Sequence, residues 1–158
     1  MNKLISFLFT ILLFSACDPC KDVVCLNEGI CLDGTCLCPD FYEGADCGTE
    51  ERSNYFATYN GSTTYTDAQG NTNTYPDSKV IASSNKGVAY INIEGGIYSI
   101  LDTPGSGVFT IPSQSSANPG ASASDFSGSG NFSGTYMTYT LTVENNGETV
   151  TMSFTGTK

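Results

Sequence analysis

The sequence contains no histidine and no tryptophan, and it has only six Lys and Arg residues compared with sixteen Asp and Glu residues. The lack of histidine excludes Ser-His-Asp and Cys-His catalysis and the His-based zinc motifs. The net charge of −10 and the pI of about 4.1 argue against nucleic-acid binding, because that interaction needs Lys and Arg to neutralise phosphates. Electrostatic attachment to anionic lipid headgroups is disfavoured for the same reason.

Cysteine is missing from the last 111 residues, yet seven cysteines lie between Cys17 and Cys47. Disulfides persist in oxidising compartments, so this clustering indicates an exported protein. Because seven is an odd number, one cysteine needs a role other than an internal disulfide.

The N-terminus has the layout of a signal peptide over residues 1–16. Lys3 supplies the positive charge, residues 4–14 are apolar apart from Ser6 and Thr10, and two small residues come next. The apolar run is shorter than the ~20 residues that a spanning helix needs.

The run Leu13-Phe14-Ser15-Ala16-Cys17 resembles the lipobox of bacterial lipoproteins. The resemblance implies that Cys17 carries diacylglycerol, begins the mature protein and attaches it to the membrane of the cell envelope, most simply the outer membrane. The alternative is an ordinary cleaved signal that leaves Cys17 as a thiol. Lipid on Cys17 leaves an even number of cysteines, which favours the lipoprotein.

The six other cysteines are separated by gaps of four, five, four, one and eight residues; they are Cys20, Cys25, Cys31, Cys36, Cys38 and Cys47. Six cysteines allow fifteen pairings. So short a segment cannot bury enough apolar area to fold without bridges. Asp33-Gly34 predicts a two-residue hairpin turn within it.

Residues 36–47 resemble the second half of an EGF-like domain. They keep the C-x-C-P spacing, Tyr42 and Gly44, with Phe41 where that family usually has glycine. The resemblance implies one pairing, Cys20–Cys31, Cys25–Cys36 and Cys38–Cys47, in an EGF-like module over residues 17–47.

Metal binding by this module is not expected. Zinc sites favour paired C-x₂₋₄-C knuckles and often histidine. The calcium-binding EGF-like subfamily carries an acidic run before its first cysteine, where this chain has only Asp18 and Pro19 between Cys17 and Cys20. We interpret the remaining acidic residues as a solvated surface; they are Asp22, Glu28, Asp33, Asp40, Glu43 and Asp46.

Residues 48–53 are polar and predict a linker, and residues 54–158 have the period-two apolar pattern of strands. A hairpin around Asn146-Gly147 would pair Val143 with Val150, Leu141 with Met152, and Tyr139 with Phe154. A second hairpin around Gly95-Gly96 would pair Ile93 with Tyr98 and Ile91 with Ile100.

Further strands are expected over residues 55–66, 78–84, 108–112 and 122–132, separated by Gly- and Pro-containing turns. The fold class is therefore mainly β, a small disulfide-rich module followed by an antiparallel β-barrel or β-sandwich of about eight strands. Residues 126–134 weakly resemble lipocalin-like domains of bacterial lipoproteins, and we interpret Gly128-Ser129-Gly130 within them as a turn or bulge.

No arrangement in the sequence predicts an enzyme. A paired-carboxylate hydrolase would draw on scattered acids, namely Asp67, Asp77, Glu94, Asp102, Asp125, Glu144 and Glu148. Threonines at 138, 140, 142, 149, 151 and 155 form rows that we interpret as a solvent face.

The predicted function is a non-enzymatic, membrane-anchored envelope or surface binding protein, without cofactor or nucleic-acid partner; its protein or glycan partner is not predicted. The alternative is a lipocalin-like carrier of a small apolar ligand in the periplasm, because an eight-stranded barrel can enclose one.

Overall fold

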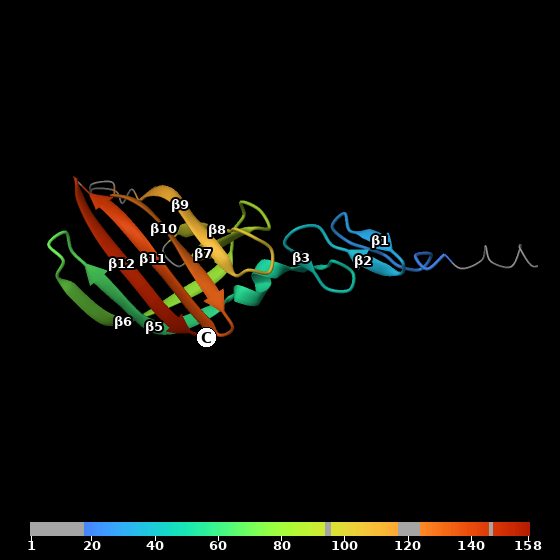
Figure 1. Cartoon of the computed structure of the whole chain (residues 1–158), viewed down its shortest axis with the longest axis horizontal. Coiled ribbons are helices and arrows are strands. Elements are labelled where there is room, and N and C mark those ends of the chain that lie inside the picture. Colours follow the sequence, from blue (N-terminus) through green and yellow to red (C-terminus); the bar gives the residue numbers. More distant parts are fainter. Residues whose placement is uncertain (1–17, 94–95, 117–123, 146) are drawn as a thin grey trace, which may run out of the picture. The chain divides into compact units, whose positions relative to one another are not determined.

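The computed structural model describes residues 18–93, 96–116, 124–145 and 147–158. The chain divides into two compact units, Met1–Thr49 and Glu50–Lys158. Both are built from antiparallel strands, and the two units are described separately below (Figure 1).

The first unit holds three disulfides and two small sheets. Strands β1 (Ile30–Leu32) and β2 (Thr35–Leu37) form a hairpin, and β3 (Tyr42–Glu43) pairs with β4 (Thr49–Glu50). The disulfides are Cys20–Cys31, Cys25–Cys36 and Cys38–Cys47, the pairs that the EGF-like resemblance implied. The predicted turn is present, and Asp33 and Gly34 both have the positive φ of a type I′ turn.

The second unit is a closed eight-stranded barrel in which successive strands are neighbours and β12 pairs with β5 (Figure 1). The fold is therefore a barrel rather than a sandwich. Its strands are β5 (Ala57–Thr66), β6 (Thr72–Ser83), β7 (Tyr90–Ile93), β8 (Ile97–Leu101), β9 (Val108–Ser116), β10 (Ser124–Ser133), β11 (Tyr136–Asn145) and β12 (Glu148–Thr157), preceded by the 3-10 helix η1 (Glu51–Tyr55).

The C-terminal hairpin has the predicted register. Tyr139 pairs with Phe154, Leu141 with Met152 and Val143 with Val150, so each apolar side chain faces an apolar partner inside the barrel. Of its turn residues, Asn146 lies outside the described residues and Gly147 has φ 83°.

The register predicted for the β7–β8 hairpin is wrong by one residue. Ile93 pairs with Ile97 and Ile91 with Ser99, so three residues rather than two connect the strands. This register buries Leu101 and Ser99 inside the barrel. Tyr98 is left on the outside, where Lys86 Nζ lies 4.2 Å from the centre of its ring. Residues 94–95 of the connection, including Glu94, lie outside the described residues.

Strand β6 begins six residues before the predicted strand, and its ladder with β7 is short. All ten residues of β5 pair with β6, whereas the pairs with β7 involve only Ile81, Ala82 and Ser83. Pro76 stands within β6, opposite Ser62 of β5. Proline has no N–H to donate to a neighbouring strand. Pro76 is tolerated because the pairs between β6 and β7 begin only at Ile81, so no β7 residue is paired with Pro76.

Two stretches of polar sequence belong to strands. β9 runs to Ser116 rather than ending at residue 112, and Gly128-Ser129-Gly130 lies inside β10 rather than in a turn. The register between β9 and β10 does shift between Phe126 and Gly128, so a bulge lies beside these glycines.

Inward-facing side chains of the eight strands form the main core. Its buried apolar members are Tyr59, Ile81, Ile91, Ile93, Leu101, Phe109, Ile111, Phe132, Met137, Tyr139, Leu141 and Phe154. Among the described residues, no helix has the length and apolar character required to cross a membrane.

Candidate functional site

One end of the barrel is closed by η1. Arg52 is 9 % exposed, and its Nη1 donates hydrogen bonds to the carbonyl oxygens of Ser84, Gly87 and Tyr90 at 2.7, 2.8 and 2.9 Å. Its Nε donates to Glu50 Oε2 at 2.7 Å. The guanidinium thus ties the start of the barrel to the connection between β6 and β7, with its charge paired.

Glu51 and a group of aromatic rings complete the closure of this end. Glu51 Oε1 accepts hydrogen bonds from the Tyr55 hydroxyl and from the Gly105 amide in the β8–β9 connection. The Tyr55 ring stacks on Phe132 at 4.4 Å, and Phe132 also packs against Phe109. Residues 51–53, which composition assigned to a polar linker, are therefore part of the barrel unit.

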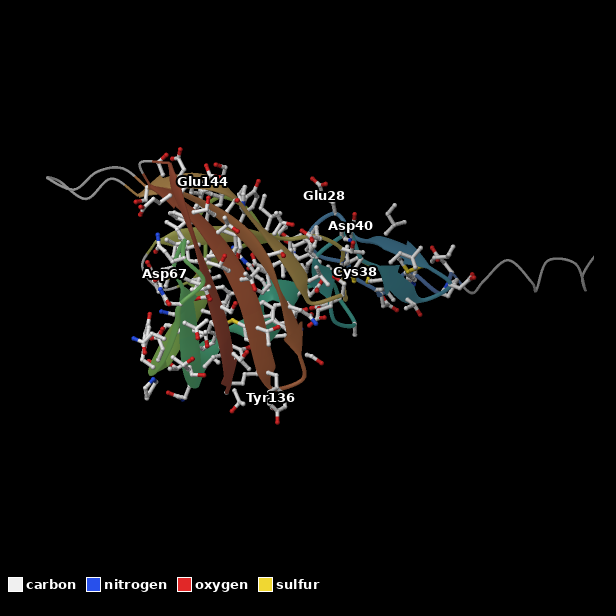
Figure 2. All side chains as sticks on the ribbon, turned by 60° about the vertical axis from the view of Figure 1, so that its left-hand side comes forward. Glu28, Cys38, Asp40, Asp67, Tyr136 and Glu144 are labelled. Carbon is white, nitrogen blue, oxygen red and sulfur yellow. A yellow bond between two sulfur atoms is a disulfide. The ribbon has the colours of Figure 1, made fainter. Side chains whose placement is uncertain are left out.

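The opposite end of the barrel is more open. On the inward face of β5, exposure rises from 0 % at Tyr59 to 37 % at Tyr65. On β6 it rises from 2 % at Ile81 to 40 % at Tyr75. Figure 2 shows Tyr136 and Glu144 at opposite ends of β11, Tyr136 at the closed end and Glu144 at the open end. The inward-facing side chains are therefore buried at the closed end and partly exposed at the opposite end, and we call this inner surface, from its buried base to its exposed rim, the cup.

A charged group lies on the inward wall of this cup. Thr63 Oγ1 donates a 2.6 Å hydrogen bond to Asp77 Oδ2, and Lys79 Nζ lies 2.9 Å from the same oxygen. Asp77 was one of the predicted acids, whereas Thr63 and Lys79 were not singled out. Every second residue of β6 from Tyr75 to Ile81 faces inward. This alternation is the sequence signal that could have placed Asp77 and Lys79 on one inward face.

The surroundings of Asp77 move its pKa in both directions. Burial raises the pKa, while the Thr63 hydroxyl, the Lys79 ammonium and the Ser78 amide lower it, and the net pKa lies below the ordinary 3.8. A carboxylate with a lowered folded-state pKa stabilises the protein above its unfolded pKa, and this stability is lost as the pH falls through the folded value.

We therefore expect Asp77→Asn to destabilise the barrel at pH 6 and to have progressively less effect below pH ~4. Urea unfolding of both proteins between pH 6 and pH 2 measures the difference. Asp125→Asn is the control, because the Asp125 side chain is exposed on the outer face of β10. A difference that stays constant down to pH 2 would contradict the proposed role of the ionised carboxylate.

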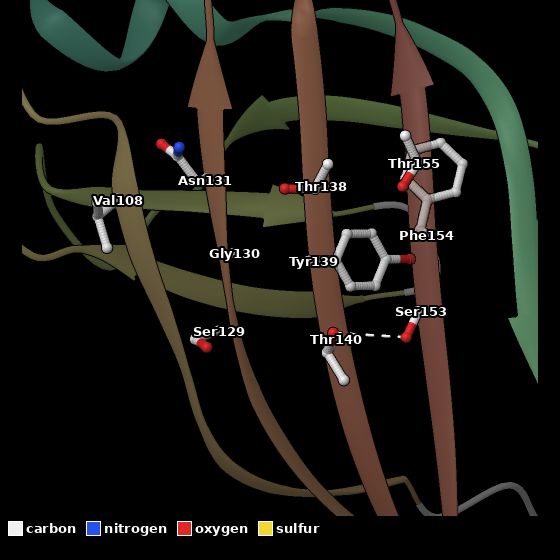
Figure 3. Close-up of a pocket in the computed structure, with 10 residues that line it drawn as sticks. All are labelled: Val108, Ser129, Gly130, Asn131, Thr138, Tyr139, Thr140, Ser153, Phe154 and Thr155. Carbon is white, nitrogen blue, oxygen red and sulfur yellow. Dashed lines mark hydrogen bonds between the residues drawn. The ribbon is translucent and has the colours of Figure 1, made fainter. Parts of the chain in front are cut away.

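A shallow hollow of about 360 Å³ lies on the outer face of β10, β11 and β12. Figure 3 shows small hydroxyl and amide side chains around it, and Thr140 and Ser153 are joined by a 3.5 Å hydrogen bond. Its lining contains no charged residue; it consists of Val108, Ser129, Gly130, Asn131, Thr138, Tyr139, Thr140, Ser153, Phe154 and Thr155.

Gly130 forms part of the floor of this hollow and has no room for a side chain. A β-carbon built there would lie 2.3 Å from Phe109 Cζ and 2.5 Å from the Thr138 carbonyl oxygen. The glycine lets the Phe109 ring pack against the β10 backbone from inside the barrel.

We expect Gly130→Ala to destabilise the barrel by about 1–3 kcal/mol, the usual cost of overpacking a core. Ser129→Ala, at the exposed neighbouring position, should change stability by less than about 0.5 kcal/mol. Chemical unfolding measures both. Equal stability of the two variants would show that Phe109 and β11 adjust freely.

The structure does not gather the predicted acids into one site. Asp67 caps its own loop by accepting hydrogen bonds from Gln69 and Asn71, and Asp125 accepts one from the Ser115 hydroxyl. Within the described ranges, no group of three or more Cys, Asp or Glu residues is placed to hold a metal ion.

The threonine rows of β11 and β12 continue across the outer face of the barrel. Thr142 pairs with Thr151, which pairs with Thr66 of β5, and the Thr64 and Thr74 hydroxyls are 2.8 Å apart. These side chains form an uncharged hydroxyl surface around the hollow.

Comparisons with protein-family models, with curated proteins and with solved structures find no match to this chain.

Proposed function

We propose that this chain is a non-enzymatic binding protein of the bacterial cell envelope, attached by lipid on Cys17, in which the barrel carries the recognition surface. The hollow on β10–β12 is the observation that carries the proposal. Asn131 can both donate and accept hydrogen bonds, and the surrounding hydroxyls can do the same. An uncharged glycan chain presents the complementary array of hydroxyl groups.

The export and anchoring parts of this proposal have separate support. Three disulfides in the first unit require an oxidising compartment. The lipobox-like run before Cys17 supplies the anchor, and two or more acyl chains make such anchoring stable.

Location is tested by treating intact cells with a protease that does not cross the outer membrane, with lysed cells as the control. Cleavage of the barrel on intact cells is expected for a surface binding protein. Cleavage only after lysis would exclude surface adhesion. In parallel, Cys17→Ser is expected to release the protein from the membrane fraction, and retention there would contradict lipid attachment.

Recognition by the hollow is tested on an array of envelope and extracellular glycans. Asn131→Leu combined with Thr138→Val is expected to abolish glycan binding, because both substitutions remove hydrogen-bonding groups from the lining. Thr58→Val is the matched control, since Thr58 is exposed on β5 away from the hollow. Equal glycan binding by both variants would exclude the hollow as the glycan-binding site.

A second candidate function, a carrier of a small apolar ligand, is favoured by the cup. Its base is aromatic and aliphatic, and Tyr65 and Tyr75 are accessible at its open end. The Ser99 hydroxyl is buried on an inward face and has no hydrogen-bond partner, so a ligand could satisfy it.

The carrier hypothesis predicts saturable, one-site binding of an apolar naphthalene dye to the full chain. Tyr65→Ser with Tyr75→Ser should weaken that binding, while Tyr136→Ser, at the closed end, should not. Dye binding that does not saturate, or that is unaffected by the first pair, would exclude the carrier.

A further inference from the structure

The first unit exposes an unusual amount of apolar surface. Five of the ten exposed large apolar side chains of the described residues lie between Val24 and Leu37, although this stretch is only 14 residues long. Ile30 is 69 % exposed, Leu32 56 % and Leu37 55 %. Contiguous exposed apolar side chains generally mark a contact surface.

Three of these side chains share one face of the β1–β2 hairpin. Ile30 pairs with Leu37, and Leu32 lies two residues after Ile30, so all three point to the same side. Cys31 pairs with Cys36 and points to the other side, where both form disulfides. We call Ile30, Leu32 and Leu37 the apolar face of the hairpin.

The turn of this hairpin lies beside the chain segment that leads to Cys17. A β-carbon built on Gly34 would be 3.4 Å from the Pro19 carbonyl oxygen, so Pro19 packs against the turn. The Cys20–Cys31 disulfide fixes the next residue to β1, with a Cα–Cα distance of 5.9 Å. Three peptide steps separate Cys17 from Cys20, which limits their Cα separation to about 11 Å.

We infer that the apolar face of the hairpin inserts into the outer part of the lipid bilayer that holds the acyl chains of Cys17. This inference rests on the lipid attachment proposed above. A lipid on Cys17 would hold the hairpin at the bilayer surface, where three aliphatic side chains can leave water for the boundary of headgroups and acyl chains.

The charge of the module determines which kind of membrane contact is possible. Residues 18–47 contain one basic residue, Lys21, and seven acidic residues; these are Asp18, Asp22, Glu28, Asp33, Asp40, Glu43 and Asp46. Attraction to anionic headgroups is therefore excluded as the driving force. The contact should be apolar, insensitive to salt and stronger on zwitterionic than on anionic lipid.

The test uses the mature chain with Cys17→Ser, so that no acyl chain is present, and measures its flotation with phosphatidylcholine vesicles. Replacing all three residues of the apolar face by Thr is expected to lower the partition coefficient at least roughly tenfold. The matched control replaces three exposed apolar residues of the barrel, Val80, Val108 and Tyr136, each by Thr. This control should change the partition coefficient less than about twofold. Raising NaCl to about 0.5 M should leave binding unchanged, because screening acts on charges.

Far-UV circular dichroism and an assay for free thiols confirm that each variant is folded and fully oxidised. Absence of vesicle binding by the Cys17→Ser protein, or equal binding by the apolar-face variant, would overturn the inference. So would a dimer in vesicle-free solution that the apolar-face substitutions dissociate, because the face would then be covered by a second copy. Labelling of Cys17 with a fatty acid in cells is scored separately, so failure of lipid attachment is distinguishable from failure of hairpin insertion.

Discussion

Reduction of the disulfides is expected to unfold residues 18–47 completely while the barrel stays folded. The only buried apolar side chains described in this module are Cys36 and Cys47, which are themselves bridged. The bridges close separations of 11, 11 and 9 residues. Each such loop contributes about 3 kcal/mol in the chain-entropy model, and no other core replaces that contribution.

Limited proteolysis with and without a thiol reductant, read by mass spectrometry, measures this effect. The reduced protein should be cut rapidly between Asp18 and Cys47 and yield a resistant fragment that begins near Glu50. The barrel has no cysteine, so its thermal midpoint, followed by circular dichroism, is the internal control. A lowered barrel midpoint after reduction, or a resistant reduced module, would contradict the expectation.

Loss of the Arg52 side chain should produce the largest effect of a single substitution on the barrel. Arg52→Met removes the charged donor from three backbone carbonyls and leaves the Glu50 carboxylate without its partner. The Glu50 side chain is 39 % exposed and can be hydrated, but three carbonyl oxygens lose their donor, which costs about 3–5 kcal/mol in total. We expect a decrease of this size in the free energy of unfolding.

Urea unfolding followed by circular dichroism measures the change. Lys86→Met is the matched control, because it removes a positive charge from the same β6–β7 connection but loses only a contact with the Tyr98 ring. We expect less than about 1 kcal/mol for this control. Arg52→Lys should fall between the two, since lysine cannot present the guanidinium fork. An Arg52→Met effect below 1 kcal/mol would show that the carbonyls find other donors.

The elements that were predictable from the sequence combine strict alternation with an unambiguous turn. In the C-terminal hairpin, each of Tyr139, Leu141 and Val143 meets an apolar partner in one register only, and Asn146-Gly147 fixes the connection. The β7–β8 hairpin lacked that constraint. Tyr98 suits either face of a strand, and a three-residue connection ending at Gly96 fits as well as the two-residue turn did.

Other features depend on partners that are distant in sequence. Glu51 and Arg52 look like linker residues, and their burial depends on groups 32 to 54 residues away. The early start of β6 depends on its complete ladder with β5 rather than on its own polar sequence. The hollow could not be predicted from the sequence either, because it forms where Gly130 lies beside small residues of two other strands.

The order of the strands also determines when the barrel can close. Every neighbouring pair in the barrel is consecutive in sequence except β5 and β12, whose paired residues lie 85 to 97 positions apart. As the chain emerges N-terminus first, seven strands can assemble hairpin by hairpin, but β5 and β11 keep open edges until β12 arrives. Unpaired edges of this kind recruit strands from other chains. Protection of the incomplete barrel from aggregation therefore depends on the ten residues of β12.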